Sequence, residues 1–298
     1  DAILTATNDV YLSQVNTNDG ATPAGTVYVI ADSDLSGVGA ITDNGAGNVN
    51  ITALNASLRA ASGIGAADAI DTDVTNVAAV TDHGDIKIDD VSALTVSTID
   101  GRAFSLALTV GSFGETNTGE VADLSGVTVT DTNGFGADTQ DSGVDFIGLQ
   151  AKGAIIVAAG NAIRNLDAGD ITLDANAGGV TLNAAVDSRD DGGTFTGTVR
   201  ISATGAVTQS AAGIITADTL GVRTSSGQVN LLTAQNDVNT LANETAVGDI
   251  GFRDVDGFQL NRVTGQTNTM FDDDSLFTQT DGLIAGSGTI RLIAEGAA

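Results

Sequence analysis

The sequence predicts an all-β protein built as a parallel β-helix, or β-solenoid, in which short strands wind around a narrow core. Three observations support this fold class. Apolar and polar residues alternate over short stretches and do not recur at helical spacing. One phrase that starts with glycine recurs along the chain. The composition, with 38 Gly, 1 Pro, no Trp and many small aliphatic residues among 298, suits stacked strands around a thin interior.

The recurring phrase consists of Gly, any residue, Val or Ile, any residue and a further apolar residue, often followed by Ala. Its period is two, so one face of each predicted strand is apolar and the other is polar. The copies cover 25–31, 47–53, 84–90, 169–175, 197–203, 227–233, 248–252 and 288–294. Several copies start about 20 to 30 residues apart, which is the length of three strands and three turns. This is the content of one β-helix turn.

Other alternating stretches lie between these copies and supply the remaining strands of each turn. They cover 92–98, 124–130, 217–224 and 256–263, with a weaker third strand at 206–209 and 213–216. One turn cannot bury its apolar face alone, but stacked turns can. The inward residues would be Val199, Ile201, Leu220, Val222, Val229 and Leu231, while Thr198, Arg200, Ser202, Arg223 and Asn230 would face water. Glycine at the start of each phrase would permit a positive φ at a tight corner.

The rival architecture is a string of antiparallel sandwich domains. Such domains usually carry hairpin signals, scattered Pro and a core aromatic residue such as Trp. This chain has one Pro and no Trp, and its phrase lengths drift, so the β-helix is favoured.

We expect residues 1–298 to form a single elongated segment that is part of, or processed from, a longer protein. The chain begins "DAILTATND" and ends in mid-pattern with "GTIRLIAEGAA". The most regular turns are predicted at 165–265 and 282–294. Loop insertions are predicted near 111–123, 131–146 and 265–281.

The stretches 169–184, 197–242 and 248–265 resemble the β-strand repeats of filamentous-haemagglutinin-like adhesins and related giant bacterial surface proteins. The resemblance is clearest over about 165–265, resumes near 282–294, and is looser over 1–160. It implies a right-handed parallel β-helix that is exported and serves in adhesion, biofilm formation or surface fibres. It implies little about a ligand.

Charge and composition exclude several other classes. The formal net charge is −27, and clusters of Lys and Arg that could neutralise phosphates are missing, so nucleic-acid binding is not expected. No apolar run reaches membrane-spanning length, since 154–159 is among the longest. Without cysteine, the chain has no disulfide framework, no thiol nucleophile and no Cys-ligated zinc.

Little in the sequence points to catalysis. His83 is the only histidine, and it lies in a polar stretch with acidic neighbours, where we expect a turn exposed to solvent. The alternative function is a secreted β-helix enzyme that cleaves polysaccharides with paired carboxylates. The acidic pairs Asp89–Asp90 and Asp190–Asp191 are instead expected to be solvated turns. The aromatic and cationic residues that could serve sugar binding, such as Tyr11, Tyr28, Lys87 and Lys152, do not cluster in the sequence.

Calcium binding is the most credible metal chemistry. Residues 32–43 have Asp32 and Asp34 at the first and third positions of a twelve-residue loop, Gly37 at the sixth and Asp43 at the twelfth. The final Glu of a helix–loop–helix site is replaced by Asp, and no flanking helices are predicted, so a polar turn is the alternative. Asp272 and Asp274 are further weak candidates. A Ca²⁺-dependent carbohydrate-binding module is the corresponding alternative function.

The predicted insertions carry the candidate recognition residues, because loops that leave a rigid scaffold often bind partners. Phe271 and Phe277 lie in the last insertion with several Asp residues. They could form a binding loop or fold back to cover the side of the β-helix. The sequence as a whole predicts a non-enzymatic extracellular protein of the bacterial cell surface. Its partners would be identical or neighbouring solenoid segments in a filament, and surface or matrix glycans or proteins.

Overall fold

The computed structural model describes most of the chain. The described residues are 1–18, 20, 24–44, 47–110, 113–130, 145–167, 169–190, 192–193, 195–267, 271 and 275–296. Every regular element among them is a β-strand, and none of these residues is helical. The prediction of an all-β protein is therefore confirmed. No described helix is long and apolar enough to cross a membrane.

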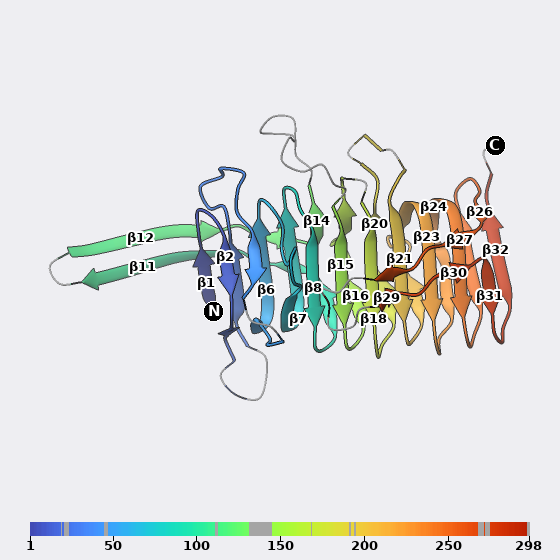
Figure 1. The fold of residues 1–298 in the computed structure, drawn as a ribbon, viewed down its shortest axis with the longest axis horizontal. Helices are drawn as coiled ribbons and strands as arrows, with labels where there is room; N and C mark the ends of the chain where they lie inside the picture. Colours follow the sequence, from blue (N-terminus) through green and yellow to red (C-terminus); the bar gives the residue numbers. More distant parts are fainter. Residues whose placement is uncertain are drawn as a thin grey trace.

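Most of the strands belong to one large sheet in which the strand pairs are parallel. Figure 1 shows them side by side along the long axis of the molecule, in chain order from β1 (Ala2–Thr5) to β32 (Ile290–Ala294). Most inner strands of this sheet pair with a strand earlier in the chain and with one later in the chain, so the strands form columns. We use "column" for strands that are hydrogen-bonded in succession and "layer" for one step along a column.

The first column begins at β2 (Val10–Leu12) and β5 (Ile41–Asp43) and continues through an isolated bridge at Ile64. Its later strands pair in succession. They are β8 (Ile86–Asp90), β15 (Ile147–Ala151), β18 (Ile171–Ala175), β21 (Thr198–Ala203), the second half of β23 (Ile215–Thr224), the end of β24 (Val229–Thr245), and both β26 (Gln259–Leu260) and β31 (Leu283–Ala285).

Two further columns run beside it. The second holds β9 (Leu94–Val96), β16 (Ile155–Val157), β19 (Val180–Leu182), β22 (Val207–Gln209), the start of β24, β25 (Ile250–Asp254) and β32. The third holds β14 (Val127–Val129), β17 (Ile163–Asn165), β20 (Val186–Asp187), the start of β23 and the middle of β24. Near the N-terminus, β1, β3 (Val15–Asn16), β4 (Thr26–Ile30), β6 (Ile51–Ala60) and β7 (Ile70–Thr81) pair in parallel and lead into these columns.

The register repeats at the interval expected from the sequence. Ile171 pairs with Ile147 and with Val199, which lie 24 and 28 residues away along the chain. Val199 pairs with Leu220, and Leu220 with Leu241, at intervals of 21 residues. The glycine-led phrases at 169–175 and 197–203 therefore pair with each other, but the next partner of 197–203 is 219–224, and residues 229–231 of the phrase at 227–233 pair in the second column with 207–208 and 250–252.

The inward side chains of the columns form one continuous aliphatic core. In the first column, successive paired or bridged positions are all apolar and at most 8% exposed: Val10, Ile41, Ile64, Ile86, Ile147, Ile171, Val199, Leu220 and Leu241. All six residues predicted to point inward are buried. Burial of each such side chain contributes about 1.5–3 kcal/mol, so this core is the main source of stability.

The expectation of a positive φ at the corner glycines holds only in part. Gly84 and Gly248 adopt the predicted left-handed backbone, with φ of +83° and +118°. Gly169 and Gly227 do not, and a different constraint acts on them. A Cβ atom would lie 1.7 Å from the Asp145 carbonyl oxygen at Gly169 and 2.3 Å from the Ala206 nitrogen at Gly227. Glycine is required there because the backbones of adjacent layers approach closely.

The structure corrects two predictions about polar residues. Arg200 was expected to face water, but it is only 5% exposed because a later segment of the chain covers it. Asp89 and Asp90 were expected in a solvated turn, but they end β8 and are 2% and 0% exposed. Their burial follows from the strand continuing to Asp90, whose carboxylate accepts hydrogen bonds from the layer formed by β7.

Two insertions form antiparallel hairpins. β10 (Thr98–Ile99) pairs with β13 (Leu124–Ser125), and between them β11 (Arg102–Val110) pairs with β12 (Phe113–Val121). The predicted loop at 111–123 is thus mostly strand. The second hairpin pairs β27 (Arg262–Val263) with β30 (Thr280–Asp281) and β28 (Gln266–Thr267) with β29 (Ser275–Phe277). It occupies most of the insertion predicted at 265–281. Most of the insertion predicted at 131–146 lies outside the described residues.

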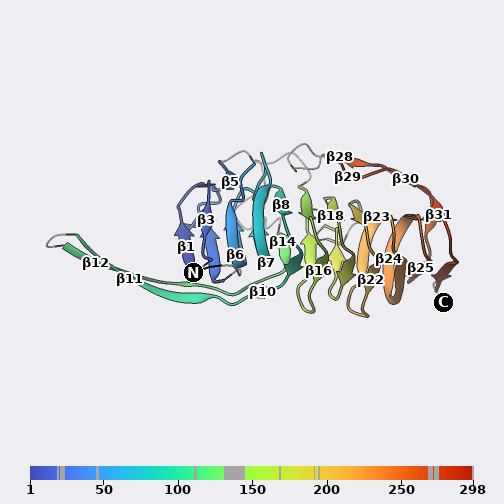
Figure 2. The ribbon, with the colours of Figure 1, turned by 90° about the horizontal axis from the view of Figure 1, so that it is seen from below.

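Figure 2 shows both hairpins against the stack of strands. The second hairpin runs back along the stack from the C-terminal end, while β11 and β12 pass β1 and continue beyond the N-terminal end.

Candidate functional surfaces

The candidate calcium loop is organised by its own hydrogen bonds. One carboxylate oxygen of Asp32 accepts bonds from the Ser36 backbone nitrogen and hydroxyl, both at 2.7 Å, and the other accepts from the Gly37 nitrogen at 3.0 Å. Burial raises the pKa of Asp32, but the hydrogen bonds from Ser36 and Gly37 outweigh it, and the net pKa lies below its ordinary value. The charged carboxylate therefore stabilises a turn in which Asp32 itself has a φ of +60°.

The candidate calcium ligands are only partly gathered around Asp32. Asp34 is exposed and its side chain lies within hydrogen-bonding reach of Asp32, whereas Asp43 accepts a 2.6 Å hydrogen bond from the side chain of Asn50. Over the part of the chain that the structure describes, no three His, Asp or Glu side chains are arranged to hold a metal ion. Asp272 and Asp274 lie outside the described residues. Calcium binding stays a prediction from the sequence.

The two candidate binding-loop phenylalanines are buried. Phe277 is 1% exposed and packs with Ala242 and Val263. Phe271 is 4% exposed and packs with Ala69 and Phe146. Both rings rest on glycines: a Cβ at Gly221 would lie 2.8 Å from the Phe277 ring, and one at Gly148 would lie 2.7 Å from the Phe271 ring. The rings thus cover the outer face of the sheet. Of the two arrangements expected from the sequence, this is the one in which the loop folds back onto the side of the stack.

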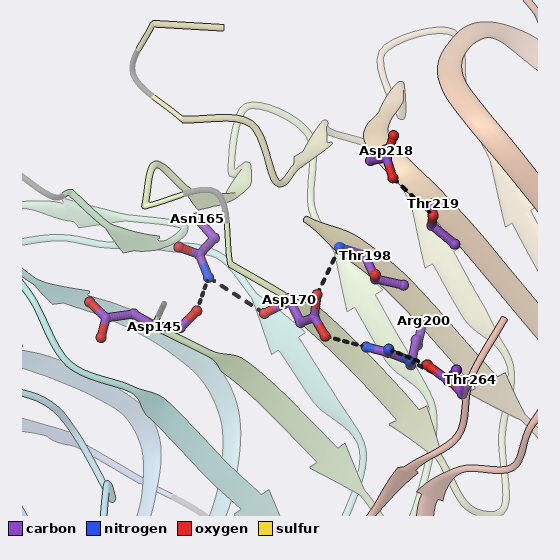
Figure 3. A network of polar contacts seen from close by, with 8 residues as sticks. All are labelled: Asp145, Asn165, Asp170, Thr198, Arg200, Asp218, Thr219 and Thr264. Carbon is purple, nitrogen blue, oxygen red and sulfur yellow. Dashed lines mark hydrogen bonds and ion pairs between the residues drawn. The ribbon is translucent and has the colours of Figure 1, made fainter. Parts of the chain in front are cut away.

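A polar network fixes the second hairpin to the sheet (Figure 3). Arg200 on β21 forms a 2.6 Å ion pair with Asp170. Its Nε atom donates to the Thr264 carbonyl oxygen at 3.0 Å, and Nη2 donates to the Thr264 hydroxyl at 3.3 Å. Asp170 also accepts a bond from the Thr198 nitrogen at 2.8 Å. A buried guanidinium with a carboxylate partner and two further acceptors is well satisfied, and it holds Thr264 in place.

A groove of about 270 Å³ lies between this hairpin and the adjacent turns. Its polar lining includes Asp174, Asn176, Ser202, Arg223, Glu244 and Thr278. Arg223 donates to Glu244 at 3.2 Å and to the Gln279 carbonyl oxygen at 3.3 Å. Asp174 and Glu244 are three strands apart in the register, about 14 Å at the usual strand spacing. That separation exceeds the one glycosidase carboxylates require, so these two do not form such a pair.

The residues considered for a polysaccharide enzyme serve the fold. Tyr28 is buried, and its hydroxyl donates to the Asp100 carbonyl oxygen at 2.8 Å. Lys87 is 4% exposed, with Nζ 2.6 Å from a carboxylate oxygen of Asp85. His83 is half-buried in the turn after β7, where its backbone nitrogen donates to the Ala61 carbonyl oxygen.

Two buried carboxylates at the ends of strands, Asp90 and Asp254, accept the same pattern of hydrogen bonds. Asp90 accepts hydrogen bonds from Thr72, Val74 and Ser92, and Asp254 accepts from Val238, Asp256 and Gly257. Each carboxylate accepts hydrogen bonds both from the turn that follows its own strand and from the backbone nitrogen of a residue 16 positions earlier, which lies in the preceding layer. Burial raises the pKa of both carboxyls above the ordinary value, although the hydrogen bonds oppose it. No local sequence pattern distinguished these residues from surface Asp.

The two ends of the large sheet present strands that are paired on one side among the described residues. β1 pairs with β4, and β32 pairs with β25. Ile290 and Leu292 of β32 pair with Ile250 and Phe252, which are fully buried, yet they are themselves 41% and 37% exposed. Leu260 and Ile284, in β26 and β31, are also exposed. Leu260, Ile290 and Leu292 thus occupy core positions and are exposed in the last described layer, whereas Ile284 pairs with the outward Glu244.

The β11–β12 hairpin is anchored at its base. Val121 and Leu124 pack with Tyr28, Ala78 and Ile99 on the outer face of the N-terminal layers. Arg59 donates to the Asp123 carbonyl oxygen at 2.7 Å, and Arg102 forms an ion pair with Asp1. This hairpin was predicted as a loop, although apolar residues alternate at 104, 106, 108 and 110 before a Gly-Ser pair.

Comparisons of the chain with protein-family models, curated proteins and solved structures find no match.

Proposed function

We propose that this chain is a right-handed parallel β-helix that serves as a non-enzymatic structural and adhesive segment of a bacterial cell-surface fibre, outside the cell. The observation that carries the proposal is the register of the columns. Strands 20 to 30 residues apart stack in parallel, and their inward positions are filled by aliphatic side chains from Val10 to Leu241. A filled aliphatic core resists bending.

The ends of the sheet support a role in fibres. Backbone groups on an unpaired strand edge can pair with another strand, and exposed core-type side chains favour a covering layer. The N-terminal and C-terminal ends are different surfaces, so contact between them is heterologous, and heterologous contacts that do not close generate filaments. The net charge of −27 keeps the sides of such a rod soluble and mutually repelling.

The fibre role is tested with the purified chain by sedimentation velocity and negative-stain electron microscopy over a range of concentrations. We expect end-to-end rods whose length grows with concentration. Ile290→Asp with Leu292→Asp should abolish them, because both side chains lie in the outermost strand.

The matched control is Val247→Asp with Val255→Asp. These residues are similarly exposed, at 54% and 38%, but lie outside β32. The control adds the same charge and should assemble like the wild type. A wild-type chain that stays monomeric at every concentration would refute the fibre role.

Adhesion is tested separately by presenting the labelled chain to arrays of glycans and matrix proteins. We expect binding that survives in the Ile290→Asp, Leu292→Asp variant, because adhesion would use the sides of the rod. An array without signal above an albumin control would remove the adhesive part of the proposal and leave the structural part standing.

A further inference from the structure

We propose that a hollow over Gly251, on the outer face of the second column, binds a carboxylate-bearing sugar such as a hexuronic acid residue of a surface or matrix glycan. The inference rests on the adhesive part of the proposed function. It names a ligand class and assigns it a place on the side of the rod.

The hollow has a volume of about 370 Å³ and is bounded by strands of three successive layers. Asn230 of β24, Gly251 of β25 and Arg291 of β32 follow one another in the register on the outward face. Because Gly251 has no side chain, Leu232 lies over its backbone, and a Cβ atom at Gly251 would be 2.7 Å from Leu232 Cδ1. The missing side chain in the middle layer leaves a depression between Asn230 and Arg291. Its volume is at the small end of the range for ligand sites in proteins.

Arg291 brings a guanidinium without a protein partner to this hollow. Arg291 and Arg164 form no hydrogen bond or ion pair with another described residue, whereas the other Lys and Arg side chains do. The chain has 38 Asp and Glu against 11 Lys and Arg, so partners for a guanidinium are abundant elsewhere on its surface. The planar fork of N–H donors matches a carboxylate in a bidentate pair. A ligand that carries a carboxylate therefore suits this position.

The rest of the lining suits hydroxyl groups. Asn230 Oδ1 is shielded from water and has no hydrogen-bond partner among the described residues. The terminal torsion of Asn has a broad minimum, so a small turn of the amide presents this acceptor to a donor in the hollow. Gln228, Asp249 and Thr289 complete the polar lining, and Asp249 accepts a 2.7 Å bond from the Thr289 nitrogen. The charge of Asp249 disfavours a ligand with a second carboxylate on that side.

A sugar acid satisfies these groups together. Its carboxylate would pair with Arg291, its hydroxyls would donate to Asn230 and Asp249, and the C–H groups of its ring would pack on Leu232. Asn230 and Arg291 are two layers apart, about 10 Å at the usual strand spacing, so one ring with its substituents lies between them. A carboxylate without a sugar would reach Arg291 but would leave Asn230 without a donor.

The position of the hollow agrees with adhesion by the sides of a rod. It lies between described strands on the outward face of the second column. A copy stacked on β32 would cover the inward side chains and the free edge of that strand. The hollow would stay accessible in a filament.

The proposal is tested by ligand-observed NMR titration of the whole chain with methyl glucuronide and methyl glucoside, which differ in the carboxylate. We expect the Kd for the glucuronide to be at least about tenfold lower. Arg291→Met keeps the length of the side chain but removes the guanidinium, and it should raise the glucuronide Kd by at least about tenfold. Arg164→Met is the matched control, because Arg164 is also exposed and without a partner among the described residues. It changes the net charge equally and should leave the Kd within about twofold.

Two further titrations separate the hollow from a bare charge. Gly251→Ala keeps every charge but displaces Leu232 into the hollow, so it should raise the glucuronide Kd at least about threefold, with an unchanged urea midpoint of unfolding. N-acetylglycine, a carboxylate without a sugar, should bind at least about tenfold more weakly than the glucuronide.

Three results would each overturn the inference: equal Kd values for the two sugars, an Arg291→Met variant that binds the glucuronide like the wild type, or N-acetylglycine that binds as tightly as the glucuronide. The adhesive role is decided independently by the arrays. A signal on the arrays that Arg291→Met leaves unchanged would place adhesion elsewhere on the rod. Silent arrays together with no glucuronide binding would refute both.

Discussion

Replacing Asn243 with leucine should stabilise the protein. Asn243 lies in β24 at an inward position between Val222 and Leu283, its partners in the adjacent layers. Its side chain is fully buried, and neither its amide oxygen nor its amide nitrogen has a hydrogen-bond partner among the residues that the structure describes. It is a polar residue at a position that is Leu173, Ile201 and Val222 in the three preceding layers.

The magnitude follows from the desolvation of the amide. A buried polar group without a partner costs about 1–3 kcal/mol, and leucine has nearly the same size with no such cost. We expect Asn243→Leu to raise the free energy of unfolding by about 2 kcal/mol. A chain of this length unfolds with an entropy of about 0.6 kcal/mol/K, so the midpoint temperature should rise by about 3 °C.

Asn236 provides the matched control, because it is equally buried but fully bonded. Its Nδ2 atom donates to the carbonyl oxygens of Leu231 and Arg253, and Oδ1 accepts from the Ile215 nitrogen and from Gln209. Asn236→Leu leaves these groups without partners and should lower the free energy of unfolding by at least about 3 kcal/mol.

Both variants are measured by calorimetry and by urea unfolding followed by circular dichroism. The refuting result is a fall in the midpoint temperature of Asn243→Leu. It would mean that the amide is satisfied in the folded protein and that this position does not belong to an aliphatic column.

Three further predictions concern the core, the buried carboxylates and the second hairpin. Ile201→Ala, at a fully buried core position, should lower the free energy of unfolding by about 2–5 kcal/mol in urea titrations, and a loss below 1 kcal/mol would contradict the packed column. Burial raises the folded-state pKa of Asp90 above its unfolded value, so its contribution to stability is fully present below the unfolded pKa and is lost as pH rises through the folded pKa. The unfolding free energy of the wild type minus that of Asp90→Asn should therefore fall as pH rises from about 4, and a difference that rises with pH would show the sign to be wrong. Arg200→Met removes the bonds to Thr264 and should speed limited proteolysis within 262–281, while equal cleavage rates in the variant and the wild type would argue against this anchor.

The sequence predicted the strands and their inward faces because period-two alternation and glycine-led turns are local signals. Val199, Ile201, Leu220 and Val222 could be placed in the core from their own neighbours in the chain. The 20 to 30 residue interval predicted the pairing of 171 with 199, but it did not predict every pair, because Ile86 pairs with Ile147, 61 residues later, and Ile250 pairs with Ile290, 40 residues later.

The features that the sequence did not predict depend on segments far apart in the chain. Arg200 is buried because Thr264, 64 residues later, lies over it, and no pattern near Arg200 shows this. In the sequence, Asp90 resembles an ordinary acidic turn residue. Its burial depends on β7, which supplies hydrogen-bond donors to its carboxylate. From the sequence, Phe271 and Phe277 could have formed an exposed binding loop or folded back to cover the side of the stack. The glycines at 148 and 221, against which their rings pack, lie in strands far away in the chain.

The spacing between layers tests the stacked-column account most directly. Thr95, Thr208, Asn230 and Arg291 occupy equivalent outward positions of the second column, so nitroxides at three, four and six layers from Thr95 can be introduced as cysteine pairs. At about 4.8 Å per layer, pulsed electron resonance should give distances from Thr95 of about 14, 19 and 29 Å to Thr208, Asn230 and Arg291. Distances that do not increase in this order, with Arg291 as close to Thr95 as Thr208 is, would contradict the account.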